Sequence, residues 1–258
     1  MGSVFAKMGK SLATYLNKPV FAYDSVILSQ DGMLEQRLRV GDVLLVEGNR
    51  RISSAIKYLT QSTWSHSALC VGNLPEYAEQ KMLIEADLEN GVLAVPASKY
   101  ARMHTRICRP VGISDVDIER LRMFVIERIG QQYDMKNVVD LLRYLFPTPP
   151  VPIRWRRKML SLGSGDPTRA ICSTIIAQAF QSIKYPILPT IERRDNSRAS
   201  VSRHKNKAKV WYFRHHSLFT PRDFDVSPYF KIIKPTLGTD FDYKSLVWQE
   251  TTSQQKER

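Results

Sequence analysis

Three residues far apart in the chain, Cys172, His66 and Glu85, carry the side chains that thiol catalysis uses. In such chemistry a thiolate attacks a carbonyl carbon, an imidazole takes up and returns the proton, and a polar residue orients the imidazole. Each residue also has a simpler explanation. Cys172 could be a buried residue at a helix start, His66 could close a loop, and Glu85 could face water from an edge strand.

Cys172 lies at or just before the first turn of a predicted helix. From Thr174 onward, apolar residues recur at three- and four-residue steps: Ile175, Ile176, Ala179, Phe180 and Ile183. Free backbone N–H groups at a helix start favour a thiolate and lower its pKa, and they can hold an oxyanion. The position makes Cys172 a candidate nucleophile.

His66 and Glu85 belong to predicted strands. Short apolar runs predict strands over residues 43–46, 68–71, 82–86, 91–96, 105–109 and 230–233. His66 begins the second run after a polar loop, and Glu85 lies inside the third. If these two strands are neighbours, the two side chains can face each other across the ladder. Strands without long helices between them favour an antiparallel sheet in an α+β domain.

Helices and boundaries complete the expected organisation. Helices are predicted over residues 52–59, over 114–129 with a capping box at Ser114, over 137–146, and from a Thr220 cap. We expect an N-terminal extension (1–37), one hydrolase domain (38–240) and a C-terminal tail (241–258). Within the domain, residues 147–168 are expected to form an insertion or lid, and residues 186–209 a long basic loop.

Four segments in a fixed order resemble the permuted branch of the papain-like NlpC superfamily, and most of all its YiiX/YebB-like group. They are Leu38–Leu45, Trp64–Gly72, Ile84–Ala86 followed by Gly91-Val92, and Cys172–Ile176. Tyr133-Asp134 and Thr220–Asp223 also resemble that group. The resemblance covers roughly residues 38 to 235. In this group the histidine comes first, the polar residue second and the cysteine last.

The resemblance implies a circularly permuted papain-like fold, in which a helix carrying the nucleophilic cysteine packs on an antiparallel sheet carrying the histidine. It implies that Cys172 is the nucleophile, His66 the general base and then acid, and Glu85 the residue that orients His66. The backbone N–H of Cys172 would donate to the oxyanion. Tyr133, Ser65 and Ser173 are further candidates for oxyanion or substrate contacts.

The remaining cysteines and histidines show no pattern that would hold a cofactor or a metal ion. The three cysteines are widely spaced and odd in number, which indicates neither a disulfide framework nor a zinc site. Cys70 and Cys108 lie in predicted strands and are expected in the core. The other four histidines lack a matching motif and are expected at the surface or in packing: His104, His204, His215 and His216.

A net charge of +13 indicates attraction to anions, such as an anionic membrane face or substrate. Basic residues cluster near 154–158 and 193–209, which could equally be solvated loops. Because no nucleic-acid-binding motif accompanies them, nucleic acid is an unlikely partner. We expect a cytoplasmic protein, either free or peripheral on a membrane, without a signal peptide or spanning helix. Residues 1–18 could form an amphipathic helix that lies on a membrane, packs on the domain or frays.

Three functions fit these features. The first is a cysteine hydrolase that cleaves amides in peptides through an acyl-enzyme. The second keeps this chemistry but acts on lipid esters at a membrane, as implied by the lecithin–retinol acyltransferase group of the same permuted branch. The third is an inactive papain-like module that binds an acidic partner, although an intact set of cysteine, histidine and glutamate argues against it.

Overall fold

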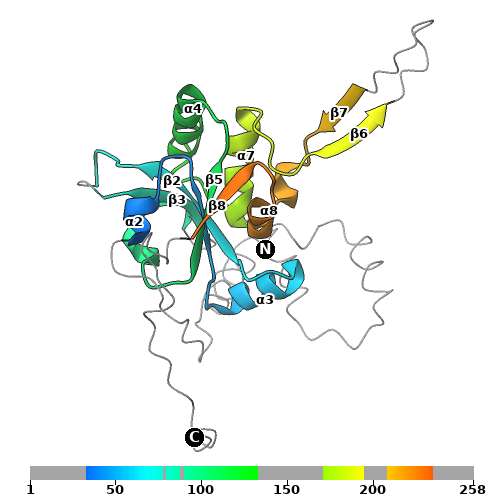
Figure 1. Cartoon of the computed structure of the whole chain (residues 1–258). Coiled ribbons are helices and arrows are strands. Elements are labelled where there is room, and N and C mark those ends of the chain that lie inside the picture. Colours follow the sequence, from blue (N-terminus) through cyan, green and yellow to red (C-terminus); the bar gives the residue numbers. More distant parts are fainter. Residues whose placement is uncertain (1–32, 78–79, 88–89, 133–170, 195–207, 235–258) are drawn as a thin grey trace, which may run out of the picture.

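The computed structural model describes residues 33–77, 80–87, 90–132, 171–194 and 208–234. Its centre is an antiparallel sheet of six strands in the order β4-β3-β2-β1-β5-β8 (Figure 1). The strands are β1 (Val43–Val46), β2 (His66–Gly72), β3 (Met82–Asp87), β4 (Gly91–Pro96), β5 (Thr105–Pro110) and β8 (Phe230–Ile233). The strands β2 and β3 are neighbours, with Leu69 opposite Ile84.

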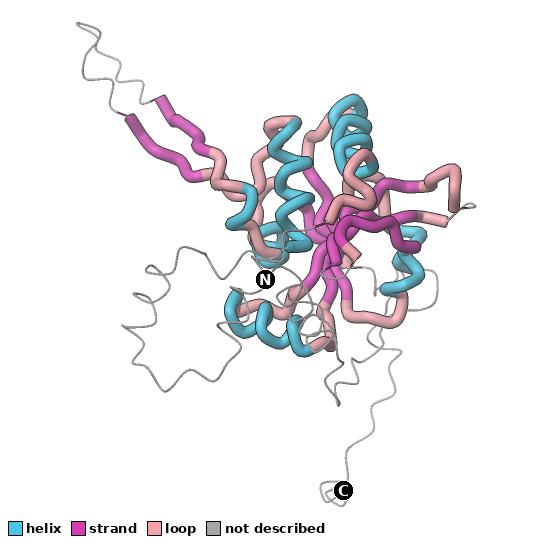
Figure 2. The backbone as a smooth tube through the Cα atoms, turned by 180° about the vertical axis from the view of Figure 1, so that it is seen from behind, coloured by secondary structure: helices cyan, strands magenta, loops and turns pink. Residues whose placement is uncertain are grey.

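Apolar side chains cover both faces of the sheet, which explains why its central strands are continuous apolar runs. On one face, Leu69 and Ile84 pack with side chains of α4 (Asp115–Ile126) and α7 (Ile171–Ser182). On the other, Ala68 and Leu83 pack with Leu34 of α2 (Met33–Arg37) and with the 3-10 helix η1 (Ala97–Tyr100). Figure 2 shows the sheet between these two layers.

The remaining helices lie outside these layers. Helix α3 (Arg51–Thr60) follows β1 and lies beyond one end of the sheet (Figures 1 and 2). The short helices η2 (His216–Leu218) and α8 (Pro221–Asp225) precede β8. The Thr220 and Asp223 side chains cap α8 reciprocally, as expected for a capping box.

The structure confirms an α+β fold built on a central antiparallel sheet. All six predicted sheet strands are present, and the Ser114 cap is confirmed because its side chain accepts a hydrogen bond from the Asp117 N–H. Helix α7 begins at Ile171, a little earlier than the apolar pattern of residues 174–183 indicated. The amphipathic helix predicted over 1–18, the helix predicted over 137–146, the insertion at 147–168 and the tail lie outside the described residues.

One expectation was wrong in part, because the segment predicted as a long basic loop contains a β-hairpin. Strand β6 (Thr190–Arg194) pairs with β7 (Ala208–Tyr212), with Thr190 opposite Tyr212. The β-branched and aromatic residue types at the hairpin base favour strands, but the basic residues around them masked this signal. Figures 1 and 2 show the hairpin projecting away from the sheet.

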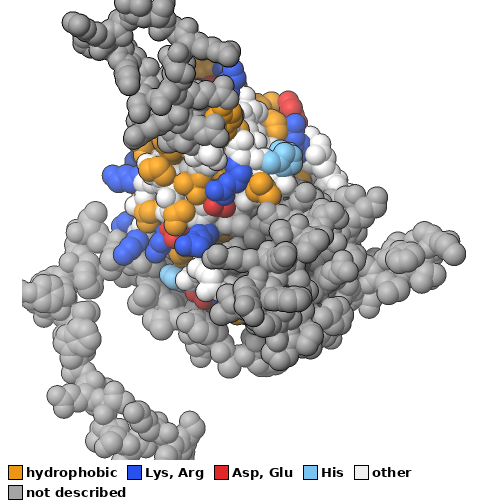
Figure 3. All heavy atoms as spheres, turned by 90° about the vertical axis from the view of Figure 1, so that its right-hand side faces the viewer, with side chains coloured by type: hydrophobic (Ala, Val, Ile, Leu, Met, Phe, Trp, Pro, Cys, Tyr) orange, Lys and Arg blue, Asp and Glu red, His pale blue; other side chains and the backbone are white. Residues whose placement is uncertain are grey.

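Figure 3 shows one face of the molecule, on which the Lys and Arg side chains of the described residues are interspersed with hydrophobic ones. None of the helices in the described ranges has the length and hydrophobicity that crossing a bilayer would require.

Candidate active site

The imidazole of His66 and the carboxylate of Glu85 face each other across β2 and β3. Alternation along the strands places both side chains on the face that α2 and η1 cover, together with Ala68 and Leu83. His66 Nε2 lies 3.1 Å from Glu85 Oε2. Glu85 is 1 % exposed, which excludes the alternative of an edge-strand carboxylate in water.

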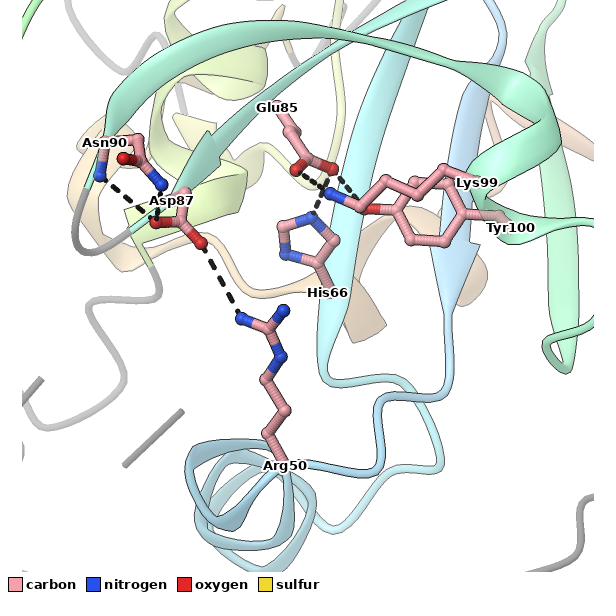
Figure 4. A network of polar contacts seen from close by, with 7 residues as sticks. All are labelled: Arg50, His66, Glu85, Asp87, Asn90, Lys99 and Tyr100. Atoms are coloured by element: carbon pink, nitrogen blue, oxygen red, sulfur yellow. Dashed lines mark hydrogen bonds and ion pairs between the residues drawn. The ribbon is translucent and has the colours of Figure 1, made fainter. Parts of the chain in front are cut away.

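Two residues of η1 hold the Glu85 carboxylate in place. The Lys99 ammonium donates to Oε1 at 2.5 Å, and the Tyr100 hydroxyl donates to Oε2, the oxygen that His66 also contacts. Figure 4 shows the three side chains converging on this carboxylate. Because the carboxylate is fixed from three directions, it can hold the imidazole in one orientation and one tautomer. Neither Lys99 nor Tyr100 was predicted.

The thiol of Cys172 meets the imidazole where α7 begins. Cys172 is the second residue of α7, and its side chain is hydrogen-bonded to His66 and to the backbone N–H of Ser67. Because Nε2 of His66 faces Glu85, Nδ1 is the ring nitrogen left for the sulfur. The three predicted residues therefore converge, in the order carboxylate, imidazole, thiol.

The electrostatics favour a proton on the imidazole and a charge on the sulfur. Burial alone would lower the pKa of His66, but the neighbouring Cys172 sulfur and then Glu85 raise it. Burial would likewise raise the pKa of Cys172, but the charge and hydrogen bond of His66 lower it. Burial opposes ionisation of Glu85 too, yet His66 and then Lys99 lower its pKa to about 2. The buried charges are thus mutually compensated, as buried charges need to be.

Helix α7 is fixed to the domain so that Cys172 is held at this point. Ile175, Ile176 and Phe180 are buried against the sheet, as their spacing predicted. The Phe180 ring contacts Phe230 edge to face at 5.2 Å between centroids. At the start of the helix, the Ser173 hydroxyl donates to the Phe219 carbonyl at 2.6 Å. Packing and this hydrogen bond together keep the thiol near the imidazole.

The chain leading to His66 is also anchored. Trp64 is 2 % exposed, and its indole N–H donates to Asp225 Oδ2 at 3.0 Å. Arg106 pairs with the other oxygen of Asp225 at 2.6 Å and lies over the Trp64 ring. These contacts join β5, α8 and the loop before β2, which limits the movement of the histidine that follows.

The other predicted site residues have different surroundings. The Ser65 hydroxyl accepts a hydrogen bond from the Gly48 N–H at 2.9 Å, and the Ser173 hydroxyl is used at Phe219 as described above. Their contact with an oxyanion or substrate stays a prediction. Tyr133 lies outside the described residues.

The remaining cysteines and histidines fit their expected places where the structure describes them. Cys70 and Cys108 are buried in β2 and β5. His104 is partly exposed and contacts Glu47, and His215 is exposed beside His216; His204 is not among the described residues. Within the described ranges, no group of three or more His, Cys, Asp and Glu side chains could hold a metal ion.

Comparison with known proteins gives one matching family over part of the chain. Residues 37–144 match a family described as permuted papain-like amidase enzyme, YaeF/YiiX, C92 family. This part of the chain is therefore similar to the permuted papain-like amidases of the YaeF/YiiX type. The match includes His66 and Glu85 and ends before Cys172, whose placement therefore rests on the structure.

Among solved structures, the chain is similar to the crystal structure of metalloprotein yiiX from Escherichia coli O157:H7. The sequence identity is 15%, the TM-score is 0.44, and the match covers 76% of this chain and 96% of the other. A search of the curated proteins gives no match.

Proposed function

We propose that the domain is a cysteine amidase in which Cys172 is the nucleophile, His66 the acid and base, and Glu85 the residue that orients His66. The single observation that carries this proposal is the chain of contacts from the buried Glu85 carboxylate through the His66 imidazole to the Cys172 sulfur. The amidase character of the matching family supports an amide substrate.

Acylation would begin from the thiolate and the imidazolium. The Cys172 sulfur attacks the amide carbon, and the carbonyl electrons move to oxygen, giving a tetrahedral oxyanion. The backbone N–H of Cys172, at the start of α7, would donate to this oxyanion. When the C–N bond breaks, the His66 imidazolium protonates the departing amine. A thioester on Cys172 and a neutral His66 remain.

Deacylation would use the same groups in reverse. Neutral His66 takes a proton from water while the water oxygen attacks the thioester carbon. The second tetrahedral intermediate collapses with cleavage of the C–S bond, which releases the carboxylic acid and restores the thiolate beside the imidazolium. Throughout the cycle, Glu85 remains ionised and bound to Lys99 and Tyr100, so its charge stabilises each imidazolium that forms.

The test is hydrolysis of a peptide library and of phospholipid vesicles by the full chain and by Cys172→Ala. We expect new amines from the peptides with the wild-type chain and none with Cys172→Ala. Cys70→Ala is the matched control, because it removes a buried thiol that lies in β2. Free fatty acid from vesicles without peptide cleavage, lost on Cys172→Ala, would replace the amidase proposal by a lipid esterase. No turnover of either substrate class, with an unreactive Cys172, would reject both.

A further inference from the structure

Ser67 follows His66 directly in β2 and points to the opposite face of the sheet. Strand alternation places its side chain with Leu69 and Val71, which belong to the core cluster shared with α7. Ser67 is fully buried, with 0% of its surface exposed. The side chain therefore lies between β2 and the helix that carries Cys172.

The Ser67 hydroxyl is a buried polar group without a regular hydrogen bond. It is the only side-chain oxygen or nitrogen among the described, buried ones that lacks a hydrogen-bond partner. Buried hydroxyls almost always have a partner, and a missing one calls for an explanation. Here the neighbouring group is the Cys172 thiol, and both the backbone N–H and the hydroxyl of Ser67 lower its pKa.

The state of the sulfur decides whether this hydroxyl can be satisfied. A neutral thiol is a weak acceptor, whereas hydrogen bonds to ionised groups are shorter and roughly twice as strong. A hydroxyl proton can rotate toward a thiolate without movement of the backbone. The hydroxyl thus gains its partner when Cys172 is ionised and loses it when Cys172 is a neutral thiol or a thioester.

We propose that Ser67 is a further residue of the active site, whose hydroxyl donates a hydrogen bond to the Cys172 thiolate and stabilises it relative to the thiol. This inference deepens the proposed function and rests on it. Ser67 then supplies a second donor to the sulfur beside its own backbone N–H, while His66, on the other face of the strand, supplies the proton acceptor. His66 and Ser67, which are consecutive in β2, would then both favour ionisation of the Cys172 thiol.

The test is the pH dependence of Cys172 alkylation by iodoacetamide, followed by mass spectrometry of the Cys172 peptide in the full chain. In Ser67→Ala, the backbone N–H remains and only the hydroxyl is lost. We expect the midpoint of the alkylation profile to rise by about one pH unit, which corresponds to the loss of one hydrogen bond to a charged group. The thermal unfolding midpoint, measured at a pH low enough to keep Cys172 a neutral thiol, should stay close to that of the wild type, since the hydroxyl then has no partner to lose.

Matched variants separate the effect of the hydroxyl from the effect of side-chain packing. Ser67→Thr and Ser67→Val have nearly the same shape and differ in the hydroxyl, so any strain affects both. We expect the threonine variant to keep a lower alkylation midpoint than the valine variant. Ser227→Ala removes another buried serine hydroxyl, which donates to the Ile187 carbonyl at 2.5 Å, and should leave the midpoint unchanged.

The outcomes distinguish this inference from the proposed function. If wild-type Cys172 is alkylated at low pH and His66→Ala abolishes this, the proposed function stands. Superimposable profiles for Ser67→Ala and the wild type, and for the threonine and valine variants, would then overturn the role of Ser67 alone. If wild-type Cys172 reacts only at the pH of an ordinary thiol, the proposed function and the inference fall together.

Discussion

Cys172 is buried to nearly the same degree as Cys70 and Cys108, yet its surroundings lower the pKa of its thiol, whereas those of the other two cysteines raise it. The exposed fractions are 5% for Cys172, 1% for Cys70 and 0% for Cys108. Burial raises the pKa of Cys70 to about 11 and raises that of Cys108 further. The pKa of Cys172 is lowered, because the charge of His66 outweighs burial.

This difference indicates that position within the fold, and not exposure, sets the direction in which the pKa of each thiol is shifted. Cys70 and Cys108 lie inside strands, where the backbone N–H groups belong to the ladder and no imidazole is adjacent. Cys172 lies in the first turn of a helix, where backbone N–H groups have no partner within the helix itself, and beside a histidine held by a buried carboxylate. Substitutions of Cys172, His66 and Glu85 test this difference.

Removal of the thiol has the largest expected effect. Cys172→Ala should lower kcat/KM by at least about 1,000-fold, because it removes the nucleophile of the proposed mechanism. Cys70→Ala should retain most of the activity. The measurement is hydrolysis of the peptide identified with the wild-type chain. Equal losses of kcat/KM in both variants would mean that the different surroundings of Cys172 and Cys70 do not matter for catalysis.

Removal of the imidazole should make Cys172 resemble Cys70. We expect His66→Ala to lower kcat/KM by about 100- to 10,000-fold and to raise the pKa of Cys172, since burial then acts without an opposing charge. His104→Ala is the matched control, because that histidine is partly exposed and contacts Glu47. A low-pH alkylation profile that persists in His66→Ala would contradict the assignment of His66.

Neutralising the Glu85 carboxylate should make the His66 imidazolium less stable, although the imidazole itself remains. In Glu85→Gln, we expect a loss of about 10- to 100-fold in kcat/KM and a lower pKa of His66, because one charge partner is lost. Tyr100→Phe keeps the carboxylate and removes one donor, so its loss should be smaller. Tyr58→Phe, at an exposed tyrosine, serves as its control. Wild-type rates in Glu85→Gln would remove Glu85 from the site.

The smallest expected effect is on stability in acid. The pKa of Glu85 is lowered from 4.5 to about 2 in the folded chain. Its contribution to the free energy of unfolding is therefore present above about pH 4.5, where the unfolded chain is already ionised, and is lost as pH falls toward 2. We expect urea unfolding of Glu85→Gln to depend less steeply on pH in this window than that of the wild type. Parallel curves would mean that Glu85 is not ionised in the folded protein.

Residues with a local signature could be found from the sequence. The apolar runs of β1 to β5 predicted the strands, and the expectation that His66 and Glu85 could face each other depended on β2 and β3 being neighbours, which they are. The start of α7 marked Cys172, although the helix begins earlier than its apolar pattern, because the small polar residues at its first turn carry no periodic signal. The order of histidine, carboxylate and cysteine carried the resemblance, and the family match over residues 37–144 agrees with it for the part that holds His66 and Glu85.

Other residues of the site had no such signature. Lys99 and Tyr100 come from a single 3-10 turn, and their contact with Glu85 depends on how η1 folds back over the sheet. Ser67 looks like an ordinary small residue in a strand until the position of α7 is known. The β6–β7 hairpin was missed because the charges of its sequence suggested a solvated loop. In each case the information lies in tertiary contacts and not in the spacing of neighbouring residues.

The most direct test of the account is a site-resolved comparison of all three thiols in the native full chain. Iodoacetamide labelling across pH 5 to 10, followed by mass spectrometry of each cysteine peptide, reports which thiol is ionised. The account predicts that Cys172 is labelled well below pH 8 while Cys70 and Cys108 remain unlabelled. Labelling of all three to the same extent, and only after denaturation, would contradict it.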